Sequence, residues 1–421
     1  MSHSAKMSRR EVLKKSSAAL GISVFSPVLI NEKNVSFLKP AISKTRIVVV
    51  GAGAFGGWTA LSLLDKNYSV TLIDQFGAGN NQSSSGGETR LIRAFYEKQI
   101  YFDLTVRSMK LWKEHEEKVR RKFFYQNGLL LFNYKSTTAE LEKAWPMYKK
   151  ANLPLEKINP SDAAKRWPQL NTDGLDHIIF DPMAGYLEAR NGCISVADRF
   201  VNEGGKIIQQ KVAKDNRASG KISSVTLSDG QIIEADIFVF ACGPWLTRLF
   251  PELTKKLKVT RALCFFFASP AGEANVMENK LPTWMDRDLD GPFRSFGVPG
   301  SAYRGFKIGL TPPLNNNVTD RFDRYDRVTT TEELELAKQV LSKRFTKMKD
   351  QPVIEQRVCQ YTMTPDSDFI LDTHPEASNL WLLGGDSGHG YKLGPALGEL
   401  AADIIIGTKP KVSDFELKRL L

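Results

Sequence analysis

Cysteine and histidine are scarce in this sequence of 421 residues, which contains four Cys and five His. The cysteines lie far apart, at Cys193, Cys242, Cys264 and Cys359, and show neither the spacing of a metal-ligand set nor that of a redox pair. The sequence therefore predicts no disulfide framework and no bound metal ion.

Long apolar runs are also missing. The stretch from Ala18 to Ile30 is too short, and too often interrupted by Ser and Pro, to span a bilayer. It follows Ser-Arg-Arg-Glu-Val-Leu-Lys at 8–14, which resembles a twin-arginine export signal, although no small-x-small cleavage triplet is evident. We expect residues 1–43 to be signal and linker, read by the twin-arginine export machinery, and the protein to reach the periplasm. The alternative is a basic disordered tail on a cytoplasmic protein.

Nucleic-acid-binding motifs and internal repeats are absent as well. The formal net charge is +11, but basic residues are dispersed and alternate with acidic ones, as between residues 107 and 122. We expect this charge to aid solubility or to steer anionic substrates mildly, and we expect no nucleic-acid partner. The length is sufficient for two domains with ample cores.

A strand, turn, helix and second strand between Thr45 and Asp74 organise the chain. A β-branched run leads directly into Gly-Ala-Gly-Ala-Phe-Gly at 51–56. A segment with helical periodicity follows, and an alternating strand then ends at Asp74. This order predicts one βαβ unit.

The glycine spacing in this unit predicts a dinucleotide site. Gly51 permits a tight turn, Gly53 lets the backbone approach a pyrophosphate, and Gly56 allows close packing of helix and strand. The helix N-terminus favours phosphate. Asp74 lies roughly 20 residues beyond the glycines, where a carboxylate accepts from ribose hydroxyls. A fortuitous glycine turn is the alternative.

The chain after Asp74 does not continue as a nicotinamide-binding fold, because no second crossover helix follows. Residues 77–87 are a polar loop expected to wrap a ligand, and residues 88–93 are expected to open a helical region that reaches toward Lys122. Single strands are expected at 124–132 and 206–212.

We predict an α/β fold (α+β overall) with two domains. The Rossmann-like nucleotide-binding domain is discontinuous and comprises residues 44–125, 189–258 and 352–421. A substrate domain comprises residues 126–188 and 259–351. Its antiparallel sheet is expected to include the strands 261–268, 293–298 and 303–310.

Five sequence blocks together resemble the FAD-dependent amine and amino-acid oxidases of the D-amino-acid-oxidase superfamily. The similarity is strongest to the branch of monomeric sarcosine oxidase and N-methyltryptophan oxidase, and it covers nearly everything from Thr45 to Gly407. The blocks are the glycine fingerprint at 51–56 and residues 87–93, 359–364, 368–375 and 388–392.

The resemblance implies that FAD is the cofactor and that Cys359 is joined through sulfur to its 8α-methyl group. It also implies that Lys307 lies near flavin N5, where positive charge favours the reduction of molecular oxygen. Thr89 and Arg90 would lie under the flavin ring. From the residues alone, Cys359 could equally be a small buried hydrophobe and Lys307 an outward-facing residue of an edge strand.

Arg93 and Lys392 match the two cations that hold the substrate carboxylate in that family. An Arg offers a planar two-point clamp and a Lys offers a point charge. The alternatives are a salt bridge for Arg93 and a surface position for Lys392. Tyr361 would line the pocket. Gly388, Gly390 and Lys392 would face the flavin, because the following helix directs its positive end there.

The sequence departs from the family pattern at three positions. Gly86 stands where sarcosine oxidase has His, and Phe296 and Thr311 stand where it has Tyr and His around the lysine strand. His389 is expected to support the backbone of its glycine loop rather than to replace those groups. We therefore expect a roomier pocket that is more apolar on one side, and sarcosine itself is not assured as the substrate.

The resemblance implies an oxidase of a carboxylate-bearing secondary or N-methyl amine. Hydride would pass to flavin N5, water would hydrolyse the imine, and oxygen would give hydrogen peroxide. The expected partners are a small-molecule amine or amino acid and molecular oxygen, and we expect a monomer. One alternative is an exported FAD-dependent amino-acid dehydrogenase with another electron acceptor. The other is a flavin-retaining binding protein without turnover.

Overall fold

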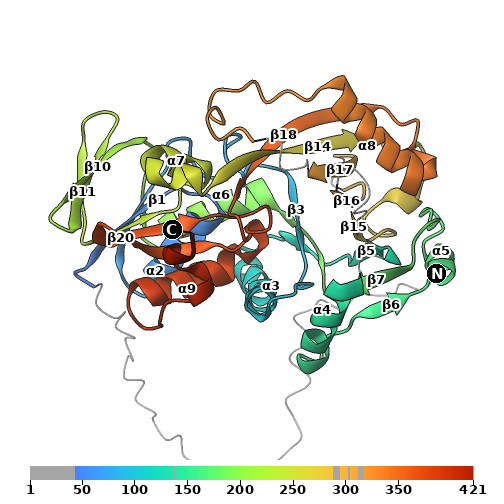
Figure 1. Ribbon diagram of the computed structural model, residues 1–421, viewed down its shortest axis with the longest axis horizontal. Helices are drawn as coiled ribbons and strands as arrows, with labels where there is room; N and C mark the ends of the chain where they lie inside the picture. The colour runs from blue at the N-terminus through green and yellow to red at the C-terminus, as the bar shows by residue number, and fades with distance from the viewer. Residues whose placement is uncertain (1–42, 136–137, 288–293, 302–303, 312–316, 421) are drawn as a thin grey trace, which may run out of the picture. The chain divides into compact units, whose positions relative to one another are not determined.

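The computed structural model of this chain describes residues 43–135, 138–287, 294–301, 304–311 and 317–420 (Figure 1). The predicted twin-arginine signal lies outside the described residues. Residues Ile42–Leu421 group into one compact unit. Within the described ranges, no helix combines the length and the apolar character needed to cross a bilayer.

A six-stranded sheet carries the predicted βαβ unit. Its strands are parallel except for the edge pair β19 and β20. The order is β19 (Ile370–His374), β20 (Ala377–Gly384), β13 (Ile237–Phe240), β1 (Arg46–Val50), β2 (Ser69–Ile73) and β9 (Lys206–Ile208). Strand β1 is buried on both faces: Ile47 and Val49 point into one core cluster, and Val48 and Val50 into another. A β-branched run without polar alternation is typical of such a doubly covered strand.

Helices cover one face of this sheet. They are α2 (Ala54–Asp65), α3 (Gln99–Val119), α6 (Ala189–Asn202) and α9 (Gly394–Ile405). Helix α9 packs against α2 and α3, and Figure 1 shows α2 and α9 side by side beneath β20. The other face packs on a three-stranded sheet of β10 (Val212–Ala218), β11 (Lys221–Leu227) and β12 (Ile232–Glu234), and on α7 (Leu246–Leu249).

A second, eight-stranded sheet is antiparallel except for the β15–β5 pair. Its order is β18 (Val353–Met363), β14 (Lys258–Phe267), β17 (Phe306–Thr311), β16 (Arg294–Val298), β15 (Thr283–Asp286), β5 (Leu129–Asn133), β7 (His177–Asp181) and β6 (Glu156–Ile158). The antiparallel sheet predicted around β14, β16 and β17 is therefore present. Strand β18, which we placed in the nucleotide-binding domain, pairs along β14 in this sheet.

Three helices accompany the second sheet in sequence: α4 (Thr138–Lys150), α5 (Pro160–Arg166) and α8 (Thr331–Arg344). Helix α8 begins with a capping box, in which the Thr330 hydroxyl accepts from Glu333 N at 3.2 Å and the Glu333 carboxylate accepts from Thr330 N at 2.9 Å. Such reciprocal bonds satisfy two backbone donors at a helix start.

Three predicted elements were wrong in detail. Residues 88–93 do not open a helix: β3 (Thr89–Ile92) pairs with β8 (Gly185–Glu188), which also pairs with β4 (Phe124–Tyr125), and α3 begins only at Gln99. Partner strands that are distant in sequence override local helical patterns. The strand predicted at 124–132 is β4 and β5, in different sheets and separated at Gly128 by a backbone φ of +82°. The strand predicted at 206–212 is likewise divided between β9 and β10.

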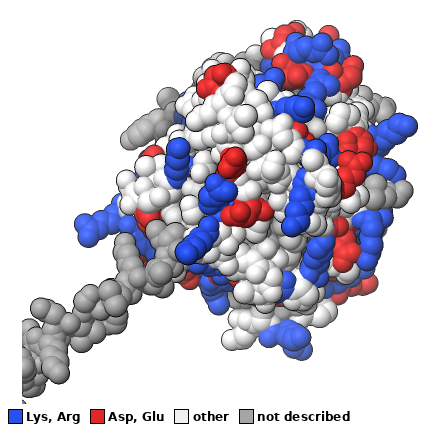
Figure 2. Space-filling view, turned by 90° about the vertical axis from the view of Figure 1, so that its left-hand side faces the viewer, with Lys and Arg blue, Asp and Glu red and all other residues white. Residues whose placement is uncertain are grey.

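The surface charges are intermingled. On the face shown in Figure 2, Lys and Arg side chains lie next to Asp and Glu side chains and uncharged surface. No continuous basic band crosses the described part of this face, which agrees with the dispersed charge of the sequence.

Candidate functional site

A cavity of about 840 Å³ lies at the carboxyl ends of the parallel strands. Its wall includes residues that directly follow four strands of the six-stranded sheet: Gly51 after β1, Asp74 after β2, Ala241 after β13 and Gly385 after β20. In open α/β sheets this edge is where ligands bind.

The glycine turn forms one part of the cavity wall. Gly51 has a φ of +106°, and a Cβ atom there would lie 2.4 Å from the carbonyl oxygen of Ala241. A Cβ atom at Gly56 would lie only 1.9 Å from the Gly51 carbonyl oxygen. Gly53 is the N-cap of helix α2 and has no side chain to offer a capping hydrogen bond, and the Ser85 hydroxyl accepts from Ala54 N at 3.1 Å. The positive end of a helix next to a cavity suits a phosphate group.

Asp74 lies beside this turn. One carboxylate oxygen accepts from Ala52 N and the other from Phe76 N, both at 2.8 Å. Burial raises the pKa of Asp74, and these backbone hydrogen bonds oppose the rise. Each carboxylate oxygen has a second lone pair. The carboxylate can therefore accept a further hydrogen bond from a hydroxyl group in the cavity.

Arg93 and Lys392 line the same cavity. Arg93 donates to the Phe95 carbonyl oxygen and lies 3.2 Å from the Met285 sulfur, and Lys392 Nζ donates to the His389 carbonyl oxygen at 2.7 Å. No carboxylate of the described residues forms an ion pair with either cation. Lys392 is only 5% exposed, and burial together with Arg93 holds its pKa well below the ordinary value. Burial raises the pKa of the Asp181 carboxyl, and Arg93 lies near enough to oppose this rise, but the two form no ion pair. An anion in the cavity would provide a direct partner for both cations.

Tyr361, Gly388 and Gly390 also line the cavity. The sequence analysis missed Asp386, which precedes the two glycines in their loop. One carboxylate oxygen of Asp386 accepts from Thr362 N at 3.2 Å and from Gly388 N at 3.1 Å, and burial raises its pKa to about 6. Its position two residues after β20 was the available signal, because residues at that edge face the ligand site.

Four predicted residues meet in a second, smaller cavity or at its border. Lys307, Cys359 and Arg90 line this space of about 10 Å³, and Lys307 Nζ donates to the Thr89 carbonyl oxygen at 2.8 Å and contacts its hydroxyl at 3.2 Å. Arg90 also lines the large cavity and donates to the Cys359 sulfur at 3.4 Å. Arg90 therefore forms a partition, and neither Lys307 nor Cys359 lines the large cavity.

Lys307 does not lie on an edge strand. Strand β17 is hydrogen-bonded on both sides, to β14 and β16, and Lys307 is 3% exposed. Burial and the nearby Arg90 lower its pKa to about 8. The outward-facing alternative is thereby excluded for this residue.

The departures from the family pattern have a structural basis at Gly86. A Cβ atom at this position would lie 1.8 Å from the Asn80 carbonyl oxygen, so no side chain fits on this backbone. Phe296 and Thr311 both line the cavity, and the Phe296 ring centre lies 5.8 Å from Lys307 Nζ. The cavity is thus apolar where the family pattern has a phenol.

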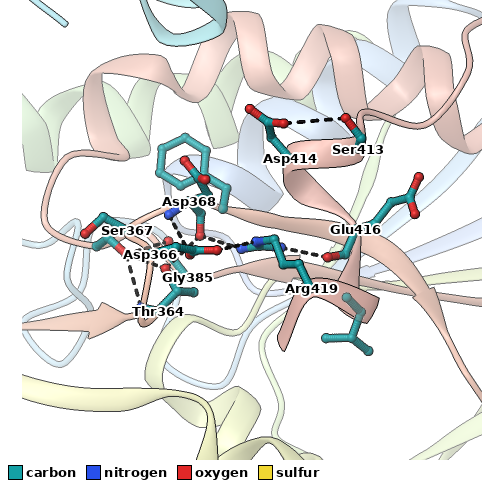
Figure 3. A network of polar contacts seen from close by, with 12 residues as sticks. Thr364, Asp366, Ser367, Asp368, Gly385, Ser413, Asp414, Glu416 and Arg419 are labelled. Carbon is teal, nitrogen blue, oxygen red and sulfur yellow. Dashed lines mark hydrogen bonds and ion pairs between the residues drawn. The ribbon is translucent and has the colours of Figure 1, made fainter. Parts of the chain in front are cut away.

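Figure 3 shows a network of polar contacts, some of whose residues line the cavity. Arg419 donates to the Asp366 carboxylate and to the Asp368 carbonyl oxygen, each at 2.8 Å. Thr364 donates to the same carbonyl oxygen at 2.8 Å and contacts the Ser387 hydroxyl at 3.1 Å. The C-terminal segment thereby holds the loop 364–368, of which 366–368 line the cavity.

These residues fit a flavin adenine dinucleotide. The positive end of α2 at the glycine turn suits the pyrophosphate, Asp74 suits the ribose, and the buried cations lie at positions that line the same continuous space. Among the described residues, no group of three or more His, Cys, Asp or Glu side chains could hold a metal ion.

Comparisons with known proteins agree with this geometry. The DAO family, described as FAD dependent oxidoreductase, matches residues 46–404. Monomeric sarcosine oxidase from Bacillus sp. (strain B-0618) is 27% identical over 386 residues, covering 89% of this chain and 95% of that protein. N-methyl-L-tryptophan oxidase from Yersinia pestis (strain Pestoides F) is 26% identical over 382 residues, covering 89% and 98%. The solved structure of L-proline dehydrogenase from P. horikoshii has a similar fold, with a TM-score of 0.75 and 21% identity, covering 89% and 96%.

Proposed function

Because this chain belongs to the family of FAD-dependent oxidoreductases, we propose that it oxidises the carbon–nitrogen bond of an amine that carries a carboxylate. The similarity to sarcosine oxidase and N-methyl-L-tryptophan oxidase supports amine oxidation. The single observation that supports a carboxylate in the substrate is the pair Arg93 and Lys392, which line the cavity and form no ion pair with a carboxylate of the described residues.

Each residue has a distinct part in this proposal. Arg93 and Lys392 hold the carboxylate, while Phe296 and Met285 present apolar surface to the rest of the substrate. The glycine turn and Asp74 would hold FAD, which would supply the acceptor for the hydride of the carbon beside the nitrogen; water would hydrolyse the imine that remains. No side chain need act as a strong base, because an apolar, water-poor site favours the neutral amine over its ammonium form.

The proposal is tested by adding a panel of N-methyl and cyclic amino acids to the purified yellow protein without oxygen. We expect at least one member to bleach the flavin absorbance, and its decarboxylated analogue to bleach it far more slowly. If no member bleaches the colour, the chain is the flavin-retaining binding protein without turnover.

We further propose that Cys359 is joined to the flavin through sulfur. Precipitating the wild-type protein with acid is expected to leave the yellow colour on the polypeptide, whereas Cys359→Ala is expected to release it. Cys264→Ala is the matched control, because Cys264 lines the same small cavity. The mass of the denatured chain measures the bound flavin. Release of the colour by the wild type would show the attachment to be wrong.

We propose molecular oxygen as the electron acceptor, with hydrogen peroxide as product, through the charge of Lys307. Replacing Lys307 with Met is expected to slow reoxidation by oxygen about 100-fold, a typical effect of removing one charge-stabilising group. Since the Lys307 pKa is lowered to about 8, the wild-type reaction should slow as the pH rises through this value. The variant should lose this pH dependence. Stopped-flow absorbance under air measures both.

A second candidate function is a dehydrogenase that uses another electron acceptor. The position of Lys307 favours it, because this side chain is engaged with Thr89 and does not line the large cavity. A peroxide assay under air separates the two functions: substrate-dependent peroxide supports the oxidase, and turnover only with an added artificial acceptor supports the dehydrogenase.

A further inference from the structure

We propose that Tyr96 positions the two cations of the carboxylate site. The inference rests on the proposed function, because it concerns how the same site holds its anion. Tyr96 lines the large cavity three residues after Arg93, in the segment between β3 and α3.

Both cations face the Tyr96 ring. The Arg93 guanidinium carbon lies 4.9 Å from the ring centre, and Lys392 Nζ lies 5.1 Å from it. The face of an aromatic ring attracts a cation, and the attraction is larger where water is excluded. Two like charges without a carboxylate between them repel each other. The ring offsets this repulsion and holds each cation beside it before an anion arrives.

A chain of hydrogen bonds fixes the orientation of the ring. His389 Nε2 lies 2.9 Å from the carbonyl oxygen of Ser367, which can only accept, so Nε2 carries the hydrogen. His389 Nδ1 must then accept from the Tyr96 hydroxyl, which lies 3.0 Å away. Burial and the nearby Lys392 lower the His389 pKa to about 3, so this neutral tautomer persists at ordinary pH.

The surroundings restrict Tyr96 further. Its ring stacks on Tyr101 with 5.3 Å between centres, and Tyr101 donates to the Asp368 carboxylate at 3.0 Å. Ser367 and Asp368 belong to the loop that Arg419 holds (Figure 3). Since the Tyr96 hydroxyl hydrogen is committed to His389, Tyr96 acts on a bound anion through Arg93 and Lys392. It is a positioning residue.

The test compares two probes that differ in charge, 2-furoate and furan-2-carboxamide, by the change each causes in the flavin absorbance of the holoenzyme. We expect Tyr96→Leu to weaken 2-furoate binding about 10-fold, because both cation–ring contacts are lost. Tyr96→Phe keeps the ring and should weaken it about 3- to 5-fold, the usual effect of one lost hydrogen bond. Binding of furan-2-carboxamide should change less than 2-fold in either variant, whereas a merely structural defect would weaken both probes.

The variant His389→Gln extends the test if Tyr96→Leu does not fold. The Gln amide can still donate to Ser367 but offers the Tyr96 hydroxyl no ring nitrogen. We expect His389→Gln to match Tyr96→Phe, and the double variant to show no further loss, since coupled residues are not additive. The inference is overturned if Tyr96→Phe and His389→Gln bind 2-furoate with wild-type affinity, or if their effects add fully in the double variant. The proposed function would stand in either case. If the wild type itself does not prefer 2-furoate to the carboxamide, the proposed carboxylate site fails instead.

Discussion

Alanine in place of Gly56 is expected to give a colourless, destabilised protein, whereas alanine in place of the neighbouring Gly57 is expected to be tolerated. Both glycines lie in helix α2 and follow each other in sequence. A Cβ atom at Gly56 would lie 1.9 Å from a backbone oxygen of the glycine turn, but at Gly57 the nearest contact is an ordinary 3.5 Å to the Val196 side chain.

The expected difference in stability between the two variants depends on whether the atoms that the new methyl group meets can move. The turn at Gly51 cannot yield without disturbing the cavity wall, so Gly56→Ala should cost about 3 kcal/mol or more of folding free energy, the upper end for overpacking. Gly57→Ala removes a flexible residue from a helix and should be neutral or stabilise by up to about 1 kcal/mol. Thermal unfolding and flavin content of the two variants measure this. Equal colour and equal melting temperature in both would contradict the packing argument.

Removing either cation of the carboxylate site is expected to weaken substrate binding severely. Truncating one partner of a buried charge pair typically costs about 2–5 kcal/mol. Lys392→Met and Arg93→Met should therefore each raise the dissociation constant of 2-furoate by about 100-fold or more. Lys110→Met removes an exposed charge from helix α3 and serves as the control.

The pH dependence provides an independent check on Lys392. Burial and Arg93 lower its pKa in the free protein, whereas a bound carboxylate favours the charged form and raises the pKa again. Binding therefore takes up a proton, and affinity should fall as the pH rises through the lowered pKa. Titration of 2-furoate at several pH values measures this fall, and Lys392→Met should abolish it. A flat wild-type profile between neutral and alkaline pH would contradict the role of Lys392.

The sequence predicted those parts of the fold whose signals are local. The βαβ unit was evident because the β-branched run, the glycine spacing and Asp74 follow one another within thirty residues. The cofactor class and the antiparallel sheet were also predicted, the former through several motifs in the correct order. These elements depend on neighbours in sequence or on patterns shared by a whole family.

Other features depend on partners that local patterns do not reveal. Strand β3 forms because β8, about ninety residues later, offers it a hydrogen-bonding edge. The positioning role of Tyr96 depends on its contacts with Arg93, Lys392 and His389, and two of these residues are distant in sequence. Likewise, Arg90 separates Cys359 from the large cavity because of the direction in which its side chain points, and residue spacing does not specify that direction.

The backbone course at Gly86 has a practical consequence for engineering the pocket. Asn80 bends the preceding loop on itself, since its side chain bonds to Gly77, Gln82 and Ser83. Its carbonyl oxygen occupies the space that an imidazole-bearing residue at 86 would need. Replacing Gly86 with His alone would therefore not place an imidazole at this point of the pocket. The loop at 80–86 would have to take another course first, so grafting that group onto this scaffold requires changes at Asn80 as well.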